Sequence, residues 1–143
     1  MERPYKYIIK PGWPGETMCF KAPHKNEVLR VLFDPSTTGT KRMSVWLTTF
    51  EPGKGPGLHT HPEPHEELLF VLSGKGTERV GEEVREVRAG DAVFIPPNTP
   101  HEIVNTGDDL LTLLVVAAPP GPIEQELYVH RLNKVVPTLH VEF

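Results

Sequence analysis

Proline and glycine interrupt this sequence so often that little room is left for long helices. Sixteen prolines and twelve glycines are spread over 143 residues, and proline breaks a helix interior because it lacks an N–H group and clashes with the preceding turn. The apolar runs between them are short and rich in Val, Leu, Ile and Phe, as is typical of strands. We predict an all-β chain with strands at residues 28–33, 43–50, 67–72, 76–80, 84–87, 92–95, 102–105 and 110–118.

The turns between these runs indicate antiparallel pairing. Gly81-Glu82-Glu83 suits a hairpin loop, and the segment 105–108 supplies Asn and Gly where a positive φ is needed. Many short, closely spaced strands without interleaved helices are typical of an antiparallel sandwich or barrel. The length fits one domain over residues 1–143, with a barrel core at about 28–118. The segment 5–10 reads as extended and is a candidate for an added edge strand.

Charge and hydropathy exclude several functional classes. The net charge of −4 and the isoelectric point near 6.0 give no basic surface for nucleic acid. No run approaches the roughly 20 apolar residues of a membrane helix, and the first residues do not resemble a signal peptide. We therefore expect a soluble, cytoplasmic protein that binds neither nucleic acid nor a membrane.

Histidines cluster in one short stretch. His59, His61 and His65 lie within seven residues and are followed by Glu67. Residues two apart on an extended segment project from the same face, so His59 and His61 can share one metal ion, and His65 and Glu67 have the same parity. A further histidine, His101, lies in a separate turn rich in proline and asparagine. These side chains are the candidate metal ligands.

The spacings around these histidines resemble the first motif of the cupin superfamily. That motif runs Gly, five residues, His-x-His, three or four residues, Glu, six residues, Gly. Here five residues separate Gly53 from His59, and six residues separate Glu67 from Gly74.

The second cupin motif is matched further along the chain. It runs Gly, five residues, Pro-x-Gly, two residues, His, three residues, Asn, and its positions correspond here to Gly90, Pro96, His101 and Asn105. Asn98 stands where the family has glycine, and Asn tolerates a left-handed backbone better than most residues. The resemblance implies a double-stranded β-helix, also called a cupin or jelly-roll barrel, with metal ligands facing inward near one end.

The identity of the fourth ligand stays open at this point. Five residues separate His61 from Glu67, one more than the motif allows, and a three-residue spacing would select His65. Counting back from Gly74 selects Glu67, and we favour this count because a hairpin glycine fixes strand register while a Pro-flanked loop absorbs insertions. The predicted ligands are therefore His59, His61, Glu67 and His101, with His65 as the alternative ligand or as a residue beside the site.

Three imidazoles and a carboxylate suit one divalent transition metal per chain, namely Fe, Mn, Ni or Zn. We expect a metal-dependent enzyme that acts on a small organic molecule, with a dioxygenase-like oxidation as the leading reaction. Isomerase, lyase and decarboxylase chemistry use the same ligands in the family, because fold and metal do not fix the reaction. The alternative is a barrel that binds a small molecule or sugar without catalysis. Arg79, Arg85 and Arg88 are candidates for a substrate carboxylate clamp.

The two ends of the chain, residues 1–27 and 119–143, are more apolar than disordered tails. They must pack on the chain's own barrel or on a partner. We expect a homodimer in which these ends make the contact, because strand addition would cover an open sheet edge.

Overall fold

The computed structural model describes residues 7–8, 19–22, 27–33, 35 and 38–120, and the regular elements among them are all strands. The eight predicted strands are confirmed, with ends that differ by at most one residue from the prediction. A ninth strand, β1, was not predicted. The strands are β1 (Cys19–Ala22), β2 (Glu27–Phe33), β3 (Ser44–Phe50), β4 (Glu66–Ser73), β5 (Lys75–Val80), β6 (Glu83–Arg88), β7 (Ala92–Ile95), β8 (His101–Asn105) and β9 (Leu111–Ala118).

Other predictions fall largely beyond these residues. Of the segment 5–10, the structure describes Tyr7 and Ile8, neither of which lies in a strand. The packing predicted for the two ends of the chain lies mostly outside the described residues. Within them, no helix has the length and apolar character required to cross a membrane.

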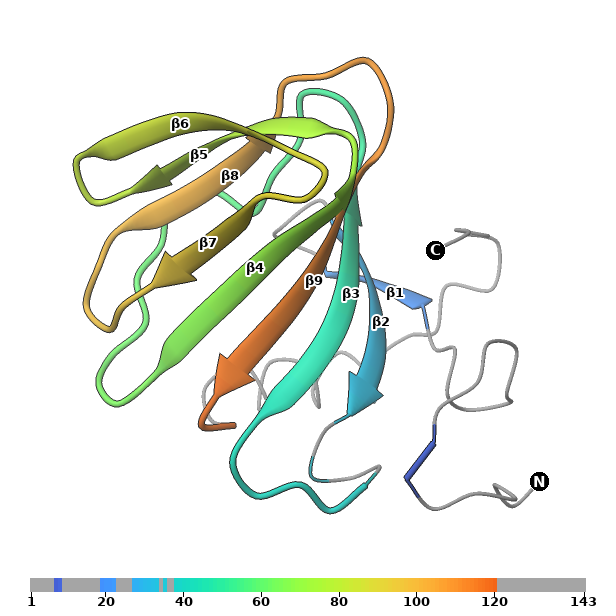
Figure 1. The fold of residues 1–143 in the computed structure, drawn as a ribbon, viewed down its shortest axis with the longest axis vertical. Helices are drawn as coiled ribbons and strands as arrows, with labels where there is room; N and C mark the ends of the chain where they lie inside the picture. The colour runs from blue at the N-terminus through green and yellow to red at the C-terminus, as the bar shows by residue number, and fades with distance from the viewer. Residues whose placement is uncertain (1–6, 9–18, 23–26, 34, 36–37, 121–143) are drawn as a thin grey trace.

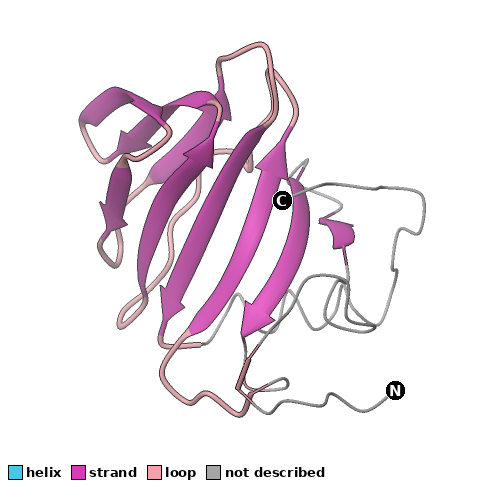
Figure 2. Cartoon of the chain, turned by 45° about the vertical axis from the view of Figure 1, so that its right-hand side comes forward, coloured by secondary structure: helices cyan, strands magenta, loops and turns pink. Residues whose placement is uncertain are grey.

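The strands form two antiparallel sheets. The larger has six strands in the order β1-β2-β3-β9-β4-β7, and the smaller has three in the order β6-β5-β8. The smaller sheet folds over the β4–β7 side of the larger one (Figure 1), and the larger sheet is strongly twisted (Figure 2). The arrangement confirms the predicted all-β, antiparallel class.

The core lies between the two sheets. Strands β4 and β9 pair so that Leu69 faces Val115 and Val71 faces Leu113, and all four side chains are buried. On β3, Trp46 and Phe50 lie on the same strand face and join this cluster. Burying these side chains supplies most of the stabilisation, at roughly 1.5–3 kcal/mol for each fully buried large apolar residue. The remaining members of the cluster are Leu29, Val31, Val87, Val93, Ile95, Ile103, Leu111 and Ala117.

Two glycines set the turns that shape the smaller sheet. Gly81 opens the two-residue loop between β5 and β6 with φ +60°, as a type II′ hairpin turn requires. Gly74 joins β4 to β5 with φ +86°, and a Cβ there would lie 2.4 Å from the carbonyl oxygen of Leu110. Gly74 is therefore required both by its backbone angle and by the close approach of the neighbouring chain.

Candidate metal centre

Main-chain hydrogen bonds bring together two segments that are distant in sequence. His59 and His101 exchange both of their backbone bonds, with N–O distances of 3.1 and 2.9 Å. The Asn98 N–H donates to the carbonyl oxygen of His61 over 2.7 Å. Asn98 has φ +55°, the left-handed conformation that asparagine tolerates. These backbone hydrogen bonds fix the positions from which the side chains of His59, His61 and His101 project.

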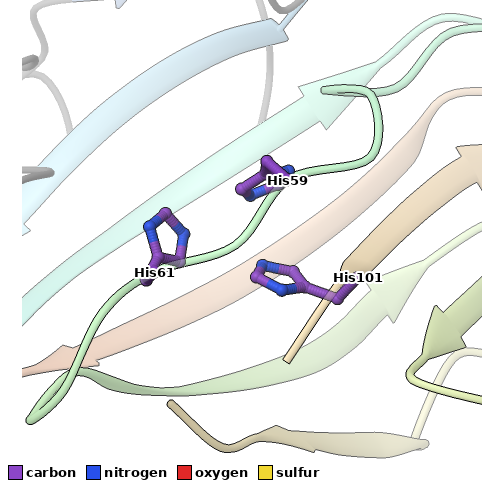
Figure 3. A group of neighbouring side chains, drawn as sticks. All are labelled: His59, His61 and His101. Atoms are coloured by element: carbon purple, nitrogen blue, oxygen red, sulfur yellow. The ribbon is translucent and has the colours of Figure 1, made fainter. Parts of the chain in front are cut away.

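The three imidazoles lie together at the start of β8 and on the loop before β4 (Figure 3). The ring centroids of His59 and His101 are 4.2 Å apart, and those of His59 and His61 are 4.9 Å apart. One ring nitrogen from each of the three lies within 4.8 Å of the other two. This separation is compatible with three ligands around one ion.

Hydrogen bonds to backbone carbonyls fix two of these rings. The Nδ1–H of His59 donates to the carbonyl oxygen of Gly57 over 2.7 Å, and the Nδ1–H of His101 donates to that of Thr99 over 2.8 Å. A carbonyl only accepts, so a neutral ring held in this way carries its proton on Nδ1 and presents the Nε2 lone pair. Partners of this kind usually orient metal-binding histidines.

Glu67 is the buried residue at the start of β4, next to the exposed Glu66. Its Oε1 atom lies 3.1 Å from His65 Nε2 and 3.3 Å from His61 Nε2. Its Oε2 atom lies 3.9 Å from His101 Nε2. The carboxylate therefore lies among three of the four histidines, and His61, His65 and Glu67 form a second group with metal-ligand spacing.

Burial and neighbouring groups set the charge states. Burial, opposed by Glu67 and reinforced by the other histidines, lowers the pKa of His61 from 6.5 to about 4. Burial raises the pKa of Glu67, but the hydrogen bond from His65 and the three nearby imidazoles outweigh it, so that this pKa lies below its ordinary value. At neutral pH the centre therefore presents a neutral His61 imidazole beside an ionised Glu67 carboxylate, the forms that bind metal.

The residues of this centre fit a metal ion because two of their buried ring nitrogens have no hydrogen-bond partner. The Nε2 atoms of His61 and His101 are buried without a hydrogen-bond partner. A buried polar atom without a partner costs free energy, and such atoms are uncommon in folded proteins. A divalent ion bound by these nitrogens would remove that cost. The predicted ligands His59, His61, Glu67 and His101, and the alternative His65, are thus brought together in one place.

The arginines considered as a carboxylate clamp make other contacts. Arg79 donates to the Gly81 carbonyl oxygen over 3.0 Å, and Arg85 to that of Val84 over 3.0 Å. Arg88 pairs with Glu86 at 2.9 Å. Within the described part of the chain, none of these contacts reaches the histidine cluster.

One buried acid, Glu78, was not among the predicted site residues. Glu78 on β5 is 4% exposed, and neither carboxylate oxygen has a hydrogen-bond partner. Glu78 lies on the same strand face as Val80, and this alternation would have identified it as an inward residue. The alternation is not visible in the sequence because Thr77, Glu78 and Arg79 are all polar.

The comparisons with known proteins agree with this architecture. The model of the Cupin domain family matches residues 46–117. Auxin-binding protein 4 of Zea mays is 37% identical over 96 residues, which cover 59% of this chain and 46% of the maize protein. The match therefore spans less than half the length of that relative.

Solved structures share the fold. A crystal structure from Thermotoga maritima, described as a predicted oxalate decarboxylase, is 26% identical with a TM-score of 0.59, covering 64% of this chain and 79% of that one. An RmlC-like cupin from Shewanella frigidimarina is 19% identical with a TM-score of 0.63, covering 81% of this chain and 96% of that one, and shows the fold alone. The predicted double-stranded β-helix is confirmed, and the chain belongs to the cupin family.

Proposed function

We propose that this chain is a metal-dependent enzyme that binds one divalent transition-metal ion through His59, His61, His101 and Glu67. The observation that carries the proposal is a pair of buried Nε2 atoms, on His61 and His101. Both lack a hydrogen-bond partner and lie beside the ionised Glu67 carboxylate.

Glu67 is favoured over His65 as the fourth ligand by the hydrogen bond between them. An ionised carboxylate only accepts, so His65 Nε2 must donate across the 3.1 Å that separates it from Glu67 Oε1. A nitrogen that carries a proton has no lone pair for a metal. His65 then holds Glu67 in orientation, as neighbours of metal ligands commonly do.

The leading reaction is a dioxygenase-like oxidation of a small organic acid, phenol or carbonyl compound. A bound divalent ion would act as a Lewis acid, as an activator of water, or as a template for substrate and dioxygen. The protein's own contribution is positioning. The carbonyls of Gly57 and Thr99 hold His59 and His101, and the apolar core between the sheets excludes water from the interior.

The competing reaction is decarboxylation, since the Thermotoga protein that resembles this chain is described as a predicted oxalate decarboxylase. The test uses protein stripped of metal and reloaded separately with Fe(II), Mn(II), Ni(II) or Zn(II). Each form is mixed with a panel of small acids, phenols and carbonyl compounds while dissolved O₂ and released CO₂ are recorded. Oxidation predicts O₂ uptake in step with loss of substrate.

Two variants serve as controls in this assay. His61→Ala should lose both the metal and the activity, whereas Glu86→Gln, on the exposed face of β6, should keep both. Release of CO₂ without O₂ uptake would replace oxidation by decarboxylation.

A second candidate is a non-catalytic barrel that binds a small molecule, favoured by the 37% identity to an auxin-binding protein. It predicts saturable ligand binding without turnover in all four metal forms. The same panel, followed by calorimetry, separates it from the enzyme.

A further inference from the structure

Glu78 lies on the same inner face of the smaller sheet as the metal centre. In the pairing of β5 with β8, Val80 is directly opposite His101, and Glu78 is directly opposite Ile103. Residues directly opposite each other in an antiparallel pair project from the same face. His101 and Ile103 are both buried, so the side chain of Glu78 also enters the interior.

The register also gives the depth of Glu78. It lies two residues along β5 from the residue opposite His101, a step of about 7 Å. Two residues further on, the interior is closed. A Cβ at Gly76 would lie 2.9 Å from a side-chain carbon of Leu111 and 3.4 Å from one of Ile103. Glu78 is therefore the last polar side chain on β5 between the histidine cluster and this packed region.

The fold makes no use of the Glu78 carboxyl group. Neither oxygen has a hydrogen-bond partner, although the side chain is only 4% exposed. Arg85 is its cross-strand neighbour on β6, but that residue is exposed and its guanidinium donates to the Val84 carbonyl oxygen. A buried carboxyl group without a partner destabilises a protein, and an apolar residue of similar size would serve the core better.

The surroundings favour the neutral form of this group. Burial, followed by the nearby charges of Glu67 and Glu102, raises the pKa of Glu78 from 4.5 to about 8. A neutral carboxylic acid both donates and accepts a hydrogen bond. It therefore suits a hydroxyl group, which does the same and which can also donate to the carboxylate oxygens when the group is ionised.

We propose that Glu78 binds the far end of the ligand, and that this end carries a neutral hydroxyl group. The inference rests on the proposed function, because the near end of the same ligand is placed on the metal. It narrows the ligand class to small organic acids with a second, hydroxylated end about one strand step away from the metal-binding carboxylate.

The test compares ligands that differ by one hydroxyl group. Protein loaded with Co(II) is titrated by calorimetry with propionate against 3-hydroxypropionate, and with benzoate against 4-hydroxybenzoate. In the wild type, at least one hydroxylated member should bind about three- to tenfold more tightly, the range of one neutral hydrogen bond. Glu78→Gln should keep this preference because its amide donates and accepts, and Glu78→Leu should abolish it.

A matched control and the metal content separate the possible results. Glu86→Gln, on the exposed face of β6, should leave the preference unchanged, and all variants should hold the same Co(II) per chain. A hydroxyl preference that survives in Glu78→Leu, or that is missing from the metal-loaded wild type, overturns the inference alone. A wild type that takes up no metal overturns the proposed function and this inference together.

Discussion

The interior faces of the two sheets differ in kind. The larger sheet turns a mostly apolar surface inward, with Val71 and Leu111 fully buried and Glu67 as a charged residue at the start of β4. The smaller sheet turns polar groups inward on adjacent strands, namely His101, Glu78 and Asn105. Asn105 is satisfied by the carbonyl oxygens of Phe50 and Asp109, whereas Glu78 is not satisfied at all. The larger sheet therefore supplies most of the stability. The chemistry comes from the smaller sheet, the loop before β4 and Glu67 at the start of β4.

The largest effect should come from removing a residue of the metal centre. His61→Ala should abolish stoichiometric metal binding while the barrel stays folded, because His61 lies on a loop and belongs to no part of the apolar core. Metal per chain by elemental analysis, with circular dichroism for the fold, measures both. Full metal occupancy in the variant would remove His61 from the ligand set.

A substitution in the apolar core of the larger sheet tests the other half of this comparison. Leu113→Ala, at a position 1% exposed, should lower the free energy of unfolding by about 2–5 kcal/mol because it leaves a cavity in the core. The folded fraction should still bind one metal ion per chain. Denaturant unfolding and metal analysis of the folded protein are the measurements, and loss of metal without loss of stability would show that the two sides are not separable.

A smaller effect distinguishes the two candidates for the fourth ligand. Glu67→Gln should weaken metal affinity at least 10- to 100-fold, roughly the range seen even for groups that only support ligands. His65→Ala should leave the metal content near that of the wild type and change the activity instead. Competition with a chelator gives the affinities. The reverse pattern would make His65 the ligand.

The unpartnered acid predicts a pH dependence. The raised pKa of about 8 means that folded Glu78 holds a proton that the unfolded chain, with a pKa near 4.5, releases. Stability from this group is therefore lost as the pH rises towards about 8. His61 titrates below this range and does not contribute. Between pH 6.5 and 8, the melting temperature of the metal-free wild type should therefore fall more steeply with pH than that of Glu78→Gln. The difference should reach about a few degrees over this range. If the melting temperatures of the two proteins change equally with pH, Glu78 does not have the raised pKa described above.

The expected homodimer should leave both interior faces unchanged. Light scattering at low micromolar concentration should give a species larger than the 16.0 kDa chain. Deletion of residues 1–18 and 121–143, which removes most of the two ends 1–27 and 119–143, should return it to a monomer if these ends make the contact. A dimer that survives the deletion would remove the role assigned to the ends.

The sequence predicted the larger sheet and the clustering of the histidines better than it predicted the smaller sheet's interior. Strands such as β9 have an apolar run bounded by turns, and the two motifs identify His59, His61 and His101 directly. The choice between Glu67 and His65 depends on the path of the loop 62–65, which spacing alone does not give. Glu78 has polar neighbours on both sides, so no alternation indicates which face it takes. β1 follows a Pro-rich segment with no periodic pattern.

The hydrogen bonds that join His59 to His101 and Asn98 to His61 use backbone atoms only. At the three histidine positions every residue type except proline can supply the same atoms, so their placement does not depend on which side chains occupy them. Asn98, with φ +55°, is the position where the residue type matters. The histidines can therefore be exchanged for other residues without moving the points from which they project. A barrel built in this way can acquire a new metal preference, or lose its metal, by single substitutions while its scaffold stays the same, which makes the fold well suited to evolving new chemistry.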